Sequence, residues 1–75
     1  MDPGDLVRVS SLAGFVFAFE RAAGVPRKRV VHNTLALYVG PNPEESRRLG
    51  QPMVDILVGE WALSIDGRFL DAVHA

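Results

Sequence analysis

Short apolar segments separated by turn residues recur along the whole of this 75-residue chain. Leu6–Val9 follows a cluster of turn residues at the start of the chain. Met53–Val58 and the segment that begins at Trp61 flank Gly59-Glu60, a pair that suits a two-residue hairpin turn. Short strands with turn signals between them are typical of a small barrel or sandwich. The sequence therefore predicts a mainly β fold.

The segment 10–24 fits either a strand or a helix. As a strand it places Phe15, Phe17 and Phe19 on one face. As a helix it leaves Phe17 off the apolar stripe and puts Gly14 in the helix interior. Three aromatic residues at a period of two favour the strand. The helical alternative over residues 11–23 stays open at this stage.

Four further segments complete the expected order of elements. Residues 22–29 read as a loop that ends in three consecutive basic residues, and residues 30–39 read as a strand. Residues 43–49 carry the strongest local signal, because a capping Asn, an early Pro, acidic and then basic residues and a closing Gly follow in that order. This order predicts a short helix. Residues 69–73 are expected to form the last strand.

The size of the chain limits how it can be stabilised. It has no cysteine, so disulfides and thiolate zinc sites are excluded. His32 and His74 are the remaining imidazoles, and they stand far apart in the sequence. We expect a single domain, 1–75, with no metal and no cofactor. Because a chain this short buries only about 60% of the surface of its unfolded form, it needs either a very well packed core or neighbouring subunits.

Charge and hydropathy narrow the classes of partner. Eight basic residues stand against nine acidic ones, whereas dedicated nucleic-acid binders usually carry a basic excess. No apolar run is long enough to span a membrane, and no export signal is recognisable. We expect a soluble chain that stays in the compartment where it is made and makes no membrane contact.

The polar residues do not suggest catalysis. The serines at 10, 11 and 64 and the carboxylates Asp55, Asp66 and Asp71 have no spacing that places a base beside a nucleophile. His32 lacks a second ligand nearby and reads as structural, and Asp66-Gly67 suits a turn. We therefore expect no enzyme activity.

The chain has more large apolar residues than a barrel of this size can enclose. The excess predicts an exposed apolar surface, and such surfaces mark interfaces. The Phe set at 15, 17 and 19 reads either as core or as an arm that contacts another subunit, and Trp61 reads as a core cap or as an interface anchor. The residues expected at an apolar interface are Phe15, Phe17, Phe19, Leu49, Trp61 and Leu70.

Two basic clusters, at 27–29 and 47–48, are candidates for contact with phosphates or with an acidic partner. The simpler interpretation is a solvated loop and helix end whose charges pair with acidic residues. The residues of this candidate patch are Arg27, Lys28, Arg29, Arg47 and Arg48.

The two ends of the chain resemble a known class of protein. The run from Pro3 to Val9, and the pair of segments 54–61 and 69–73, are similar to the opening and closing strands of small SH3-like or KOW-like barrels. The resemblance implies a five-stranded barrel, here with a helical insert around residues 43–49. Such barrels are often structural or interaction modules and are frequent among tailed-phage proteins, including virion components.

The expected function is therefore that of a non-enzymatic structural protein, a capsid decoration, cement or connector subunit. It would act through contacts with other subunits, as a homo-oligomer or in a shell. The resemblance places it in a virion assembled in the host cytoplasm, or else in the cytoplasm itself. The alternatives are a KOW-like nucleic-acid-binding module that uses the 27–29 loop, and a small regulator that docks on a host protein.

Overall fold

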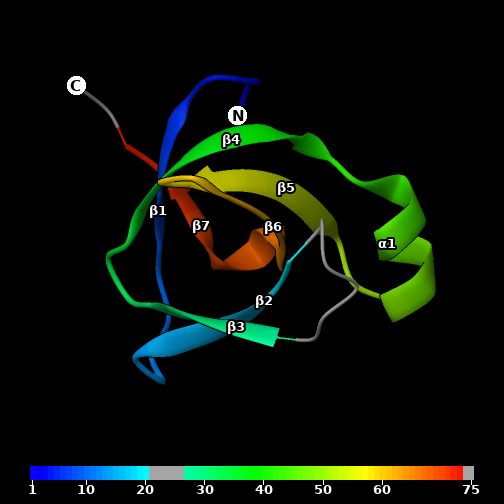
Figure 1. The fold of residues 1–75 in the computed structure, drawn as a ribbon, viewed down its shortest axis with the longest axis horizontal. Helices are drawn as coiled ribbons and strands as arrows, with labels where there is room; N and C mark the ends of the chain where they lie inside the picture. The colour runs from blue at the N-terminus through cyan, green and yellow to red at the C-terminus, as the bar shows by residue number, and fades with distance from the viewer. Residues whose placement is uncertain (21–26, 74–75) are drawn as a thin grey trace.

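The computed structural model describes residues 1–20 and 27–73 and shows one curled antiparallel sheet with a single short helix beside it (Figure 1). The strands pair in the order β3-β2-β6-β5-β4-β1-β7, so that the sheet forms a half-barrel. The elements are β1 (Leu6–Val9), β2 (Phe15–Glu20), β3 (Arg27–Val31), β4 (Leu35–Pro41), α1 (Pro43–Leu49), β5 (Met53–Val58), β6 (Trp61–Asp66), the 3-10 helix η1 (Gly67–Phe69) and β7 (Leu70–Ala72).

The core fills the concave side of the curled sheet. Alternate residues of each strand face inward, because successive side chains of a strand point to opposite faces. In β4, for example, Ala36 and Tyr38 are buried whereas Leu35 and Leu37 are exposed. The buried cluster consists of Val7, Val9, Val16, Ala18, Val30, Ala36, Tyr38, Ile56, Leu63, Ile65 and Leu70.

The mainly β class is confirmed, but the strand count of five is wrong, because the described residues form a sheet of seven strands. The segment expected as one strand over residues 30–39 is two strands separated by a turn. Asn33 adopts a left-handed conformation with φ 73°, and its N–H donates to the carbonyl of Val9. The N–H of Thr34 donates back to the carbonyl of Val31 and closes the turn. The chain therefore changes direction between β3 and β4.

The basic residues 27–29 do not lie in a loop, contrary to the sequence prediction. They begin β3, which pairs with the whole aromatic part of β2 from Phe15↔Val31 to Phe19↔Arg27. Long-range pairing of this kind overrides the weak strand preference of three consecutive cations. The same pairing shows a strand over residues 15–20, so the strand interpretation of the ambiguous segment is confirmed there. The rest of that segment from residue 21, and residues 22–26 of the expected loop, lie outside the described residues.

The helix at 43–49 is confirmed with the bounds expected. The Asn42 side chain accepts a hydrogen bond from the N–H of Glu45, and Gly50 ends the helix in the left-handed conformation. The final segment was expected as one strand over 69–73, and it is corrected to η1 followed by β7. No helix of the described residues is long and apolar enough to cross a membrane.

Candidate interaction surfaces

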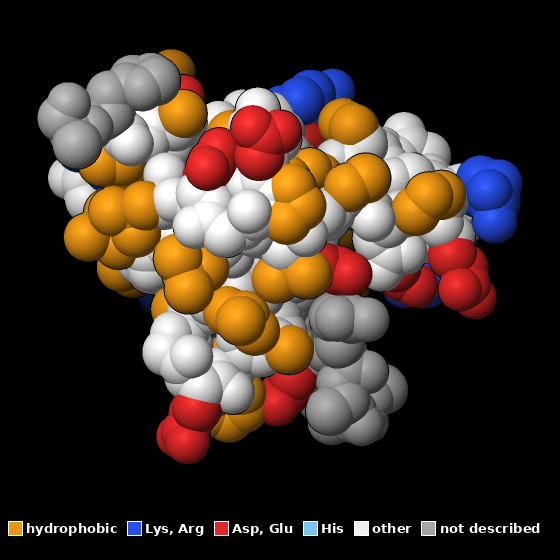
Figure 2. Space-filling model, turned by 90° about the horizontal axis from the view of Figure 1, so that it is seen from above, with side chains coloured by type: hydrophobic (Ala, Val, Ile, Leu, Met, Phe, Trp, Pro, Cys, Tyr) orange, Lys and Arg blue, Asp and Glu red, His pale blue; other side chains and the backbone are white. Residues whose placement is uncertain are grey.

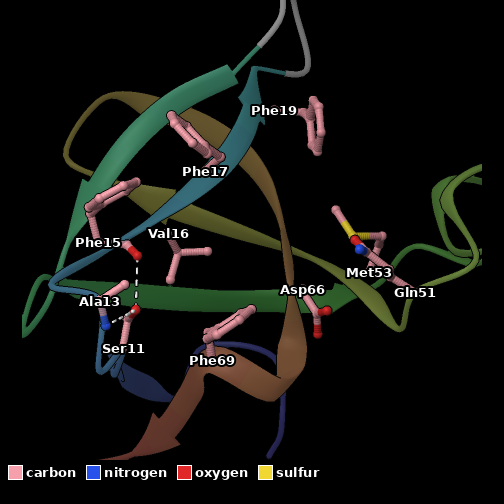
Figure 3. A pocket seen from close by; sticks show the side chains of 10 residues that line it. All are labelled: Ser11, Ala13, Phe15, Val16, Phe17, Phe19, Gln51, Met53, Asp66 and Phe69. Carbon is pink, nitrogen blue, oxygen red and sulfur yellow. Dashed lines mark hydrogen bonds between the residues drawn. The ribbon is translucent and has the colours of Figure 1, made fainter.

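A groove lined by aromatic rings opens beside β2. The sheet pairs β2 with β6 at Phe19 and Glu20, and the first half of β2 diverges from β6. A groove of about 360 Å³ lies there. Figure 3 shows the three rings along β2, the ring of Phe69 across from them, and Met53 and Asp66 on the far wall. The described residues that line it are Ser11, Ala13, Phe15, Val16, Phe17, Phe19, Gln51, Met53, Asp66 and Phe69.

The three Phe residues predicted at an interface share one face of β2, as their spacing required. Phe17 exposes 43% of its surface, and Phe15 and Phe19 are half-buried. The rings of Phe15 and Phe17 meet edge to face, with centroids 5.2 Å apart. Aromatic pairs favour this geometry because the positive edge of one ring meets the negative face of the other. The aromatic set is therefore not enclosed within a single copy of the chain.

Two of the predicted cations lie over aromatic rings of the same chain. The guanidinium carbon of Arg29 is 4.6 Å from the centroid of Phe15, and the Nζ of Lys28 is 3.7 Å from the ring of Trp61. Both contacts are cation–π interactions. Lys28 and Arg29 contact different rings because successive residues of β3 point to opposite faces of the sheet. The run 27–29 is thus split between two surfaces, and the side chain of Arg27 lies outside the described part.

The second basic cluster lies on α1 and is divided in a similar way. Arg48 pairs with Glu45 one turn away, with 2.6 Å between Nη2 and Oε2, and this side-chain bond holds the pKa of Glu45 below its ordinary value. Arg47 is exposed. Of the three remaining apolar residues predicted at an interface, Trp61 exposes 40% and Leu49 is half-buried. Leu70 belongs to the core, so its placement at a surface is wrong.

Asp66, a carboxylate in the groove wall, forms an ion pair with Arg68. The side chain of Arg68 donates to both oxygens of Asp66, with Nη2 2.6 Å from Oδ2. The backbone N–H of Arg68 also donates to Asp66. These bonds, the side-chain bond first, hold the pKa of Asp66 below its ordinary value although burial of the carboxyl opposes them. The pair fixes the turn into η1 and leaves the groove mainly apolar.

A row of aliphatic side chains crosses the convex face of the sheet. Strand register places Leu6 beside Leu37, Leu37 beside Leu57, and Leu57 beside Ala62. The N–H of Val73 donates to the carbonyl of Leu6 and extends the row by one position. We call these five residues the aliphatic row. Figure 2 looks down on Figure 1, in which β4 lies near the top below the N-terminal segment, and it shows hydrophobic side chains gathered over this face.

The three leucines of the row expose 39–45% of their surface, and Leu35 and Val39 of β4 flank them with 54% and 40%. Sequence reasoning placed the apolar excess on the aromatic arm and missed this row. The signal was present, because residues 35–39 are apolar at every position. A strand with that composition carries apolar side chains to both faces of the sheet.

A chain of hydrogen bonds under α1 involves residues that sequence analysis did not connect. The Nδ2 of Asn42 donates to Oδ1 of Asp55 at 3.1 Å, and the hydroxyl of Ser64 donates to the same oxygen at 2.7 Å. Asp55 is buried, and its carboxylate accepts both of these bonds. The hydroxyl of Ser46 accepts the N–H of Met53 at 2.8 Å and ties α1 to β5. These contacts position the helix.

Among the described residues no group of three or more His, Asp or Glu side chains is arranged to hold a metal ion. His32 accepts a hydrogen bond at Nδ1 from the N–H of Ser11, 3.0 Å away. His74, the other imidazole considered, lies outside the described residues.

Comparison with known proteins finds no match to this chain. No protein-family model matches the chain, and neither a curated protein nor a solved structure matches it.

Proposed function

We propose that this chain is a non-enzymatic structural protein that acts through contacts with other protein subunits. The observation that carries the proposal is the aliphatic row, in which three leucines on neighbouring strands expose 39–45% of their surface. Exposed apolar area is the usual driving force of association, at about 25 cal/mol per Å² before ordering costs are subtracted. Single exposed leucines are ordinary, whereas a contiguous row across four strands and the residue after β7 is typical of an interface.

We further propose that the fold is an SH3-like barrel extended by an arm. Support comes from β1, which pairs with both β4 and β7, from the hairpin of β5 and β6, and from η1 before the last strand. On this proposal β2 and β3 form the arm, which raises the strand number above five. The assembly implied by the sequence resemblance is a virion, in which the chain decorates or connects shell subunits.

Sedimentation velocity on the isolated chain tests the proposal. Between roughly micromolar and millimolar concentration, where weak protein contacts become populated, we expect the weight-average sedimentation coefficient to rise. The melting temperature should rise with it, because association stabilises the folded state by mass action. A chain that stays monomeric over this whole range, with a constant melting temperature, would count against a structural role.

A second candidate function, binding of single-stranded nucleic acid, is favoured by one arrangement. Phe17 and Arg29 are register partners on neighbouring strands, and Arg29 lies over Phe15. Aromatic faces beside cations can stack bases and contact phosphates. This function predicts that affinity for a fluorescent oligonucleotide falls steeply between 50 and 200 mM salt. Replacement of Arg27, Lys28 and Arg29 by Ala should abolish binding, whereas Arg47→Ala should preserve it.

A further inference from the structure

The aliphatic row reads nearly the same from either end. Its members are, in order, Val73 directly after β7, Leu6 of β1, Leu37 of β4, Leu57 of β5 and Ala62 of β6. Leu37 is the centre, a leucine follows on each side, and a smaller aliphatic residue closes each end. A surface with this symmetry is complementary to itself when it is turned about a two-fold axis that passes through Leu37.

Charges at the border of the row suit the same rotation. The neighbouring row of residues contains Arg8, which lies between Leu35 of β4 and Asp71 of β7. On the other side of β4, this second row ends at the β5–β6 turn, where Glu60 is exposed. A two-fold axis along β4 exchanges the two ends. Arg8 of one copy is then placed between its own Asp71 and Glu60 of the second copy, which pairs one guanidinium with two carboxylates.

The size of the face fits a contact between two copies. Leu6, Leu35, Leu37, Val39 and Leu57 are each exposed by 39–54%. Together they form an apolar patch within the range of roughly 300–600 Å² that is often functional on a monomer. With the charged border included, two such faces approach the roughly 1,200 Å² at which specific interfaces begin. No charged side chain interrupts the aliphatic row itself.

From these three observations we infer that the partner of the convex face is a second copy of this chain, bound through the aliphatic row as a two-fold symmetric dimer. The inference rests on the proposed structural function and names its first contact. In this dimer Leu37 meets Leu37, Leu6 meets Leu57, and the aromatic groove beside β2 remains open. A two-fold contact of this kind is closed, so it produces dimers and not an open chain of subunits.

A pair of lysine substitutions tests the location of the contact. Leu37→Lys places a charge at the centre of the row, and Val31→Lys places the same charge at a strand position of β3 that is 55% exposed. Sedimentation velocity should show dimers for the wild-type chain and for Val31→Lys, and monomers for Leu37→Lys. Circular dichroism should show the same fold in all three, because both positions are exposed.

The outcomes separate this inference from the proposed function. If the wild-type chain associates and Leu37→Lys associates equally well, the contact lies elsewhere and the inference is overturned while the structural function stands. If the wild-type chain never associates, both are overturned. Loss of association in Leu37→Lys but not in Val31→Lys supports the inference.

A charge exchange between copies tests the symmetry. Arg8→Glu alone brings three carboxylates together at each end of the contact, so we expect its dimer dissociation constant to rise at least tenfold. Mixed with Glu60→Arg, it should recover dimers that contain one copy of each variant, because both ends then hold opposite charges. Native mass spectrometry identifies the mixed dimer by its mass. A mixture in which Arg8→Glu stays monomeric would overturn the two-fold arrangement.

Discussion

At the scale of single residues, the polar side chains of this protein act mainly as structural connectors. Asp66 holds Arg68 and the start of η1, and Asn42 both caps α1 and bonds Asp55. Each of the two side chains accepts a backbone N–H at the start of a helix, and such an N–H has no partner within the helix itself. The two positions therefore give distinct predictions for stability.

Asp66 should make stability depend on pH in the acid range. Because its pKa is lowered in the folded state, the contribution of the Asp66–Arg68 pair is complete above the ordinary carboxyl pKa near 3.8. It is lost as pH falls through the lowered folded value. Urea unfolding should therefore find Asp66→Asn less stable than wild type at pH 7. The difference should shrink at pH 3 and below. A difference that stays constant with pH would contradict the prediction.

Asn42→Ala should destabilise the fold by about 1–2 kcal/mol. The change removes the bond to the N–H of Glu45 and leaves Asp55 with one donor fewer. Gln51→Ala, at an exposed position a short distance along the chain, serves as the control and should change stability by less than about 0.5 kcal/mol. Urea unfolding at pH 7 compares them. Equal stability of the two variants would mean that the Asn42 contacts contribute nothing.

At the scale of elements, α1 was predictable because all its signals are local. The cap, the early proline and the closing glycine stand within a few residues of one another and act without the rest of the chain. For β3 the local signal was opposite, since three cations follow a loop-forming stretch, and the strand exists through its pairing with β2. Local propensity predicts an element correctly when the element's own residues determine its structure. The prediction fails when pairing with a distant segment determines it.

Gly50 gives a prediction at this scale. It ends α1 at φ 68°, a conformation that side chains with a Cβ adopt at a cost, and no atom lies close enough to clash with an added methyl group. Gly50→Ala should therefore lower stability by about 1 kcal/mol. Gly50→Asn should lower it less, because Asn tolerates the left-handed region best among residues with side chains. Thermal unfolding of the two variants measures the difference, and an equal loss would contradict a conformational origin.

At the scale of the whole molecule, the curled sheet is apolar on both sides. The sequence showed an apolar excess and predicted its exposure, and the aromatic set does lie at the surface. The aliphatic row escaped prediction because its members come from five segments that meet only through strand register. Leu70 was misplaced for the related reason that one strand position decides between core and surface.

Two neighbouring residues of β5, one on each face of the sheet, should differ in their contribution to stability. Ile56 is fully buried and Leu57 is 39% exposed. Ile56→Ala should cost about 2–5 kcal/mol because it leaves a cavity in the core. Leu57→Ala should cost at most about 1 kcal/mol in dilute solution, where most of its surface contact with other copies is absent. Urea unfolding at low protein concentration compares the two. Similar losses would show that the face assigned to solvent is also packed.

The place of β3 at one border of the sheet has a consequence for solubility during folding and storage. A border strand offers its backbone groups to any like strand that approaches, and this is a common route to fibrous aggregates. In this protein that strand begins with three consecutive positive charges, Arg27-Lys28-Arg29. Two such borders repel each other before their backbones can join. The basic run therefore opposes edge-to-edge aggregation of the chain, and this effect requires no ligand.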